Sequence, residues 1–265
     1  MIRLDLYLSE GGYVKSRQKA KELIEGGFVL VNSSKVLKPS FLIDETVENS
    51  IKISDPCPYV SRGGLKLEKA LDDTQIDVNG KIAIDIGAST GGFTDCLIKR
   101  GASTVYAIDS GSNQLDRSLQ GNPKVISLEN YNARNINFDD IGALCDIITI
   151  DVSFISQTYI IPSAVSLLND DGVYISLIKP QFEAGRDKIG KGGIVKKSED
   201  RLFAVKRVVD CAALNGLYCS YISQSPILGG DGNVEYLAVF SKKCPKVLTE
   251  SDIKATIMCK NRREK

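Results

Sequence analysis

The pattern of hydrophobic and polar positions along the chain changes near residue 81. From there on, short apolar runs typical of buried strands alternate with longer segments whose apolar residues recur at helical spacing. The candidate strands read KIAIDIG, TVYAID, KVISLE, CDIITID, GVYISLIK, YCSYIS and EYLAVFSK. Apolar strands that alternate with amphipathic helices imply a parallel sheet covered on both faces. The pattern therefore predicts an α/β fold with a doubly wound, Rossmann-like sheet of seven strands.

The N-terminal part of the chain contains shorter elements. Ser16 begins a candidate amphipathic helix that a Gly-Gly pair ends. Residues 28–31 then predict a strand, and a turn-prone run leads to a second strand near Val36. We predict two domains with these bounds: a small one over residues 1–54, a linker over 55–62, a large one over 63–243 and a basic tail over 244–265.

The composition is typical of a protein with a packed core, with 43% hydrophobic and 25% charged residues. The net charge of +1 does not by itself indicate nucleic-acid binding. Basic residues nevertheless outnumber acidic ones at both ends, by seven to four in residues 1–38 and by eight to three from residue 242 onward. Such excesses belong either to solvated faces or to nucleic-acid contacts, and composition favours neither.

The chain has seven widely spaced cysteines and no histidine. Without a C-x-x-C pair, the cysteines predict neither a zinc site nor a disulfide framework, and free thiols fit a reducing cytosol. The missing histidine excludes Ser-His-Asp and Cys-His catalysis and His-ligated metals. The N-terminus lacks a signal-peptide pattern, and no apolar run reaches about 18 residues. We therefore expect a cytoplasmic protein that needs no metal and no membrane.

The sharpest local signal is the run IDIGASTGGFTDCL. It places Asp85 at the end of the first strand and several glycines before a helix, so that a ligand can approach bare backbone. The spacing D-x-G-x-x-x-G-G-F-T lacks the pyrophosphate-binding glycines of a dinucleotide site and suits a nucleoside better. Asp109 ends the second strand, where an acid can bind ribose hydroxyls. The two features together predict a nucleoside-type cofactor.

Polar residues also follow the next two strands, as Asn132 and Asp151. A single such residue is commonly a cap or a turn residue. Four consecutive strands that end in polar groups favour a ligand site, because the carboxyl ends of parallel strands meet at one edge of the sheet. The candidate cofactor-binding residues are Asp85, Gly87, Ser89, Gly91, Gly92, Phe93, Thr94, Asp109, Asn132 and Asp151.

Two lysines and two acids are expected at this same edge. Lys66 lies in YVSRGGLKLEKAL, a predicted helix before the first strand. Asp151 and Lys179 end the fourth and fifth strands, and Glu235 begins the seventh. A proline directly after Lys179 places this lysine at the rim of its strand. A lone lysine there is commonly structural, but the four together form a candidate catalytic group.

The run SRQKAKELIEGGFVLVNSSKVLKPS resembles the S-four-type (alpha-L) RNA-binding motif of ribosomal, pseudouridine-synthase and tRNA-synthetase proteins. The match consists of a Ser-Arg pair that opens a helix, a glycine before a strand, Val-x-Val-Asn and a Lys-Pro-Ser ending. Ser33 and Ser34 stand where that family often has glycine. The resemblance implies that the small domain binds RNA. The candidate RNA-binding residues are Arg3, Lys15, Arg17, Lys19 and Lys21.

Residues 3–242 as a whole resemble the TlyA-type ribosomal RNA 2'-O-methyltransferases, which are also labelled hemolysins and carry an FtsJ-type catalytic domain. The shared motifs are YVSRGGLKL, IDIGASTGGFTDCL, AIDSGSNQL, IDVSFIS, LIKPQFE and GNVEYL. The resemblance implies a seven-stranded methyltransferase sheet. It also implies S-adenosylmethionine as cofactor and ribosomal RNA or ribosomal subunits as partner. The expected reaction is methylation of the ribose 2'-hydroxyl of cytidine.

The family's Lys-Asp-Lys-Glu tetrad corresponds residue by residue to the candidate catalytic group, which is Lys66, Asp151, Lys179 and Glu235. In this scheme Lys179 is the general base and Lys66 stabilises the developing alkoxide, while the two acids orient the lysines. The segment Asp55-Pro56-Cys57-Pro58 departs from the family, which tends to have a basic or aromatic residue there. Coupling between the two domains through this segment stays open.

Three alternatives remain at this point. The first is a pore-forming hemolysin, as the family label suggests, although the chain shows no membrane-type segment. The second is an RNA-binding protein whose methyltransferase fold is inactive, against which the intact tetrad argues. The third is a methyltransferase that acts on a base, but methylation of cytosine C5 normally needs a cysteine nucleophile, and none follows the fourth strand.

Overall fold

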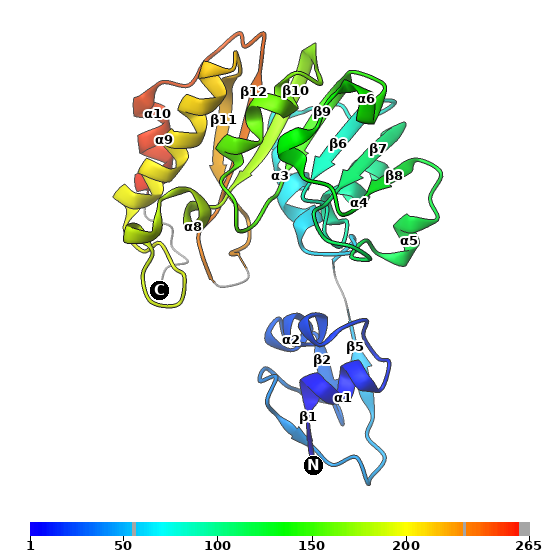
Figure 1. The fold of residues 1–265 in the computed structure, drawn as a ribbon. Helices are drawn as coiled ribbons and strands as arrows, with labels where there is room; N and C mark the ends of the chain where they lie inside the picture. Colours follow the sequence, from blue (N-terminus) through cyan, green and yellow to red (C-terminus); the bar gives the residue numbers. More distant parts are fainter. Residues whose placement is uncertain (55–56, 230–231, 260–265) are drawn as a thin grey trace. The chain divides into compact units, whose positions relative to one another are not determined.

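The computed structural model describes residues 1–54, 57–229 and 232–259 and confirms the predicted fold class (Figure 1). The chain divides into two compact units, Met1–Pro58 and Tyr59–Lys265. Asp55 and Pro56 of the predicted linker lie outside the described residues, as do residues 260–265 of the predicted basic tail. The domain bounds proposed from the sequence stay a prediction.

The first unit combines two helices with short strands. Its elements are β1 (Ile2–Arg3), α1 (Leu4–Glu10), α2 (Arg17–Glu25), β2 (Val29–Val31), β3 (Ser34–Lys35), β4 (Leu42–Ile43) and β5 (Ile51–Ile53). Strand β2 lies between β3 and β5 and is antiparallel to both. Ser16 caps α2 as predicted, because its side chain accepts a hydrogen bond from the backbone N–H of Lys19. Asn32 and Ser33 make the β2–β3 turn with φ of 48° and 66°.

The second unit contains the large sheet. Its strands are β6 (Ile82–Ile86), β7 (Thr104–Ile108), β8 (Val125–Leu128), β9 (Cys145–Ile150), β10 (Leu168–Ile178), β11 (Tyr218–Gln224) and β12 (Tyr236–Ser241). Its helices are α3 (Gly63–Thr74), α4 (Gly92–Lys99), α5 (Arg117–Gln120), α6 (Phe138–Ile141), α7 (Ile161–Val165), α8 (Pro180–Glu183), α9 (Ser198–Leu214) and α10 (Glu250–Met258).

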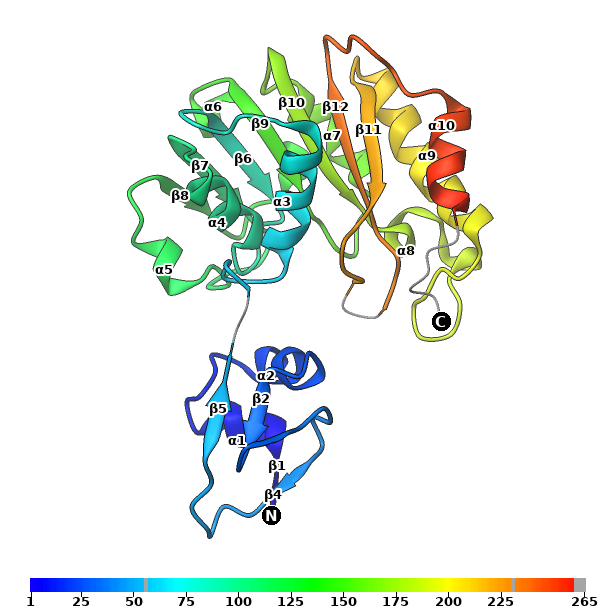
Figure 2. The same cartoon turned by 180° about the vertical axis from the view of Figure 1, so that it is seen from behind.

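The order of the strands is β11-β12-β10-β9-β6-β7-β8. Strand β12 runs antiparallel to both of its neighbours, whereas the β10-β9-β6-β7-β8 pairs are parallel. Helices α3 and α4 pack on one face, and α7, α9 and α10 pack on the other (Figures 1 and 2). The central strands β6 and β9 are almost wholly buried, which explains their near-continuous apolar sequences.

Two strands differ from the sequence prediction. Strand β8 lies at the edge of the sheet, so that its apolar run is half exposed. Strand β10 begins at Leu168, four residues before the predicted run, and includes the polar segment Asn-Asp-Asp-Gly. Its register against β9 shifts between Leu168 and Val173, as a bulge requires. Within the described part of the chain, no helix is long and apolar enough to span a membrane.

Candidate functional site

A cavity of about 670 Å³ opens at the carboxyl edge of the parallel strands. This volume lies in the range of small-molecule sites. The residues around it come from the ends of β6, β7 and β9 and from the segment after β8. Among the residues predicted to bind a cofactor, the structure brings together on the cavity wall Gly87, Ser89, Asp109, Asn132 and Asp151.

The glycine-rich turn approaches the neighbouring strand too closely for a side chain. Gly87 has a φ of 82°, and a Cβ there would lie 2.5 Å from the backbone oxygen of Asp151. Only glycine fits both the positive φ and the close approach. The bare backbone of this turn therefore faces the cavity, as a cofactor that lies against the chain requires.

Asp109 holds the wall of the cavity together. One carboxylate oxygen accepts the backbone N–H of Ser89 at 2.8 Å, and the other accepts that of Gly111 at 2.7 Å. Each oxygen retains a second lone pair that can accept a ribose hydroxyl. Asn132 also faces the cavity, and its side-chain oxygen accepts both the backbone N–H and the Nε–H of Arg134.

The other predicted cofactor residues do not line the cavity: Asp85, Gly91, Gly92, Phe93 and Thr94. Asp85 is fully buried inside β6, where its carboxylate accepts hydrogen bonds from Thr94 at 2.7 Å and Thr149 at 2.9 Å. Successive residues of a strand point to opposite faces, so that Asp85 lies under α4 instead of at the edge. Its position does not support direct binding of ribose.

Burial raises the pKa of Asp85 from 3.8 to about 6. Because the folded state then binds the proton more tightly than the unfolded state, this group stabilises the protein below pH 4, and the contribution is lost as the pH rises through 6. At ~1.4 kcal/mol per pH unit, the difference is about 3 kcal/mol. The uncharged variant Asp85→Asn should therefore gain about this much relative to wild type between pH 4 and pH 7 in urea denaturation. Parallel pH curves for the two proteins would contradict this.

Asp109→Ala is expected to weaken S-adenosylmethionine binding by about 1.5–3 kcal/mol, or roughly ten- to a hundredfold, because a carboxylate facing the cavity is removed. Calorimetry on the purified protein measures this directly. Asp77→Ala is the control, since Asp77 is exposed before β6 and its carboxylate accepts the backbone N–H of Asn79 in its own turn. Equal affinities of the two variants would mean that the turn serves another ligand.

The four candidate catalytic residues form two ion pairs. Lys66 Nζ lies 2.6 Å from Glu235 Oε2, and Lys179 Nζ lies 2.6 Å from Asp151 Oδ1. Both lysine side chains are largely buried, with 11% and 13% exposed. Lys179 also donates a hydrogen bond to Ser153 at 2.9 Å. Asp151 lines the cavity, which links one pair to the predicted cofactor site.

The topology explains why residues so distant in sequence meet. Strand β10 lies between β9 and β12, with Ile178 opposite Tyr236. Asp151 and Lys179 follow β9 and β10, whereas Glu235 precedes β12. Because β12 is antiparallel, its amino end lies at the same edge as the carboxyl ends of the other two strands. Helix α3 packs on β12 and supplies Lys66.

One residue at the cavity was not found from the sequence. Phe154 is 93% exposed and has a φ of 65°, which is a genuine outlier for an aromatic residue. Its ring lies 5.2 Å from that of Phe182 at an angle of 53°. In the sequence Phe154 follows the predicted strand end at Asp151, and nothing in the motif IDVSFIS indicates its exposure or its positive φ.

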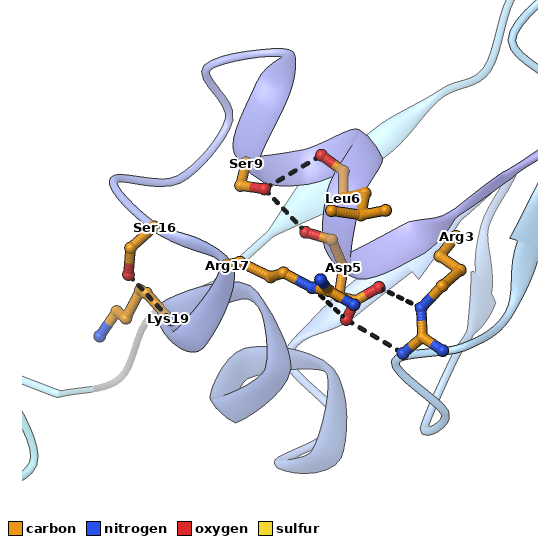
Figure 3. Close-up of polar contacts among 7 residues, drawn as sticks. All are labelled: Arg3, Asp5, Leu6, Ser9, Ser16, Arg17 and Lys19. Carbon is orange, nitrogen blue, oxygen red and sulfur yellow. Dashed lines mark hydrogen bonds and ion pairs between the residues drawn. The ribbon is translucent and has the colours of Figure 1, made fainter.

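In the first unit, two of the predicted RNA-binding residues share a buried partner. Arg3 and Arg17 each place Nε 2.9 Å from the carboxylate of Asp5, whose side chain is inaccessible to solvent (Figure 3). The bonds from Arg3 and Arg17 lower the pKa of Asp5 to about 2. Lys15 is exposed, and Lys19 and Lys21 are partly exposed on α2. Asp5 could not be found from the sequence, because Arg3, Asp5 and Arg17 lie on three different elements.

In the described ranges no group of three or more His, Cys, Asp or Glu side chains could hold a metal ion. The cavity instead offers the groups that a nucleoside needs, namely an approachable backbone turn at Gly87 and the carboxylate of Asp109. The residues present therefore fit the adenosine part of the predicted cofactor.

Comparison with known proteins agrees with this geometry. The model of the family "FtsJ-like methyltransferase" matches residues 59–242, and that of the "S4 domain" matches residues 2–48. The chain is 44% identical to Hemolysin A of Brachyspira hyodysenteriae, over 90% of this chain and 99% of that protein. It is 36% identical to the 16S/23S rRNA (cytidine-2'-O)-methyltransferase TlyA of Mycobacterium tuberculosis, over 96% and 95% of the two chains.

A solved structure from Streptococcus thermophilus, described as a hemolysin, covers 97% of this chain with a TM-score of 0.78 and 39% identity, and 94% of that chain is covered. These matches extend over both units and confirm the resemblance seen in the sequence. The chain belongs to the FtsJ-like family of S-adenosylmethionine-dependent methyltransferases and carries an S4 domain at its N-terminus.

Proposed function

We propose that the protein transfers the methyl group of S-adenosylmethionine to the ribose 2'-hydroxyl of a cytidine in ribosomal RNA. The observation that carries the proposal is the pair of lysine–carboxylate contacts, each 2.6 Å long, one of which includes Asp151 on the cavity wall. Relatives that are named for this reaction support the substrate. Because its substrate would be ribosomal RNA or ribosomal subunits, we also propose that the protein acts in the cytoplasm.

The bound cofactor supplies an electrophilic methyl group, and the chain supplies the groups that act on the hydroxyl. In its neutral amine form, Lys179 accepts the proton of the 2'-hydroxyl, and Asp151 stabilises the ammonium that results. Lys66 stabilises the negative charge that develops on the ribose oxygen, and Glu235 holds Lys66 in place. Asp109 and the turn at Gly87 hold the cofactor, so that orientation contributes much of the rate.

The S4 domain binds the RNA in this proposal. Lys19→Ala together with Lys21→Ala should weaken RNA binding and lower the slope of log affinity against log salt by about two, if each lysine contacts one phosphate. Titration of labelled ribosomal RNA at several salt concentrations measures this. Arg17→Ala should in addition lower the stability of the domain, because Arg17 pairs with buried Asp5. An unchanged slope in the double variant would mean that the lysines form only a solvated helix face.

Mass mapping of ribosomal RNA from cells with and without this gene tests the proposal in the cell. A ribose-methylated cytidine should be present in the first sample and absent from the second, and plasmid-borne wild-type protein should restore it. Identical methylation maps would overturn the proposal. The same maps identify the modified nucleotide and the ribosomal subunit.

A second candidate function, pore formation, rests on the name of the Brachyspira hyodysenteriae relative. Leakage of a dye from liposomes after addition of the purified protein would support it. The first proposal predicts no leakage at concentrations at which the protein methylates RNA.

A further inference from the structure

Two short segments begin at Asp151 and Lys179, at the carboxyl edge of the sheet. A buried carboxylate joins the far ends of these segments. One runs from Asp151 to Gln157, and the other runs from Lys179 to Glu183, the last residue of α8. We call them the rim segments. Their near ends meet in the ion pair at 2.6 Å. At their far ends, Glu183 accepts hydrogen bonds from the backbone N–H of Gln157 at 2.9 Å and from the hydroxyl of Ser156.

Glu183 takes no part in the proposed chemistry, yet it is only 1% exposed. Burial raises the pKa of its carboxyl group, whereas the bonds from Ser156 and Gln157 oppose that change. Burying a carboxyl group is costly, and an apolar residue of similar volume would fill the space at less cost. The chain thus keeps a polar contact between the two rim segments although the burial of its carboxyl group costs free energy of folding.

Gln157 extends this contact to the strand that bears Lys179. Its side-chain oxygen accepts the hydroxyl of Ser176 at 2.5 Å, and its amide group donates to the backbone oxygen of Leu177 at 3.3 Å. Both partners lie in β10 just before Lys179, whereas Glu183 lies just after it. The network therefore holds the chain on both sides of the lysine.

The middle of the first rim segment is strained. Phe154 has a φ of 65°, and such a conformation costs about 1–3 kcal/mol and persists only where the surroundings impose it. On one side, the backbone N–H of Asp151 donates to Ile86 at 2.9 Å. On the other side, Ser156 is held by Glu183. The segment is thus held on both sides of Phe154, and at its near end Asp151 pairs with Lys179.

We infer that Glu183 is a positioning residue for methyl transfer, which acts through Ser156 and Gln157 to hold Asp151 in register with Lys179. The inference rests on the proposed function. Misplacement of a reacting group by ~1 Å costs about a hundredfold in rate, so that a contact behind the site can control the chemical step. Asp109 and the turn at Gly87, which hold the cofactor in the proposed function, lie outside the rim segments, but residues 151–155 also line the cavity, so rates are compared at saturating S-adenosylmethionine.

At saturating S-adenosylmethionine, Glu183→Ala should lower the single-turnover rate of methyl transfer to ribosomal RNA by about 30- to 100-fold, while RNA affinity stays within about twofold. Glu183→Gln should recover the rate to within about fivefold, because the amide oxygen still accepts the N–H of Gln157. Asp146→Ala is the matched control. The carboxylate of Asp146 also accepts a backbone N–H, that of Ile82 at 3.0 Å, but it lies at the opposite edge of the sheet. This control should lose stability and keep the rate.

Ser156→Ala tests the route of the effect and remains informative if Glu183→Ala does not fold. It should slow methyl transfer, and its combination with Glu183→Gln should slow it by less than the product of the single effects, because both changes act on one contact. All rates are measured well below the unfolding temperature of each variant. A rate for Glu183→Ala within threefold of wild type, or a loss that Asp146→Ala shares, would overturn the inference.

Hydrogen exchange gives a reading that does not depend on activity. Loss of the Glu183 contact should speed exchange of the backbone amides of residues 153–157, whereas Asp146→Ala should leave them unchanged. Unchanged exchange in Glu183→Ala would overturn the inference even if the wild type methylates RNA. Faster exchange without methylation by the wild type would instead refute the proposed function and leave the positioning contact established.

Discussion

Lys179→Ala is expected to lower the rate of methyl transfer by at least ~100-fold, which is the usual contribution of a general base. Lys179 is largely buried directly after β10 and pairs with Asp151. The proposal gives the role of general base to no other lysine in the described part of the chain. S-adenosylmethionine affinity should change by less than about twofold, because Lys179 does not line the cavity. Single-turnover methylation and calorimetry measure the two quantities on the same protein.

Lys206→Ala provides the matched control for this variant. Lys206 also pairs with a carboxylate, that of Glu250 at 2.7 Å, but this pair lies between α9 and α10 away from the tetrad. An exposed ion pair contributes little to stability, so the control should methylate RNA at the wild-type rate. If Lys179→Ala keeps more than about a tenth of the wild-type rate, Lys179 is not the base.

Deletion of residues 1–54 should leave a folded catalytic unit that binds S-adenosylmethionine normally but methylates ribosomal subunits at least ~100-fold more slowly. Attachment of a binding domain raises the effective concentration of its ligand by ~10²–10⁴, and the truncation loses this advantage. The cut leaves the first contacts of the second unit intact. Tyr59 donates to Glu68 at 2.7 Å, and the backbone N–H of Val60 donates to Asp95 at 2.8 Å.

Circular dichroism and calorimetry establish whether the truncated protein is folded and binds the cofactor. Adding the separate S4 domain in trans should not restore the rate, because the proposed benefit comes from attachment in one chain. Full activity of the truncation on ribosomal subunits would refute the role given to this domain.

Much of the fold followed from periodicity and glycine placement. The buried strands β6 and β9 have near-continuous apolar sequences, and Ser16 and the Gly-Gly pair marked the two ends of α2. Periodicity predicted β8 and β10 as strands, but neither the exposure of β8 nor the start of β10. Strand β8 is half exposed because it lies at an edge, and β10 extends through polar residues where its register against β9 shifts.

The meeting of Asp151 and Lys179 could be predicted because both follow parallel strands, whose carboxyl ends lie at one edge of a sheet. Glu235 reaches the same edge because β12 is antiparallel, and Lys66 comes from α3. Burial inside the strand could not be predicted in the same way. Asp85 stands one residue before the end of β6, and that single position turns its side chain under α4. The strain at Phe154 and the burial of Asp5 arise from contacts with distant elements, which the local sequence does not contain.

The most direct test of the account is the chemical product of the purified enzyme. Ribosomal subunits that lack the modification are incubated with the protein and S-adenosylmethionine that carries a labelled methyl group, and the RNA is digested to nucleosides for mass spectrometry. The account predicts one labelled product, cytidine methylated on its ribose 2'-oxygen, which disappears with Lys179→Ala. Label on a base, or no label in RNA with an enzyme that binds the cofactor, would contradict it.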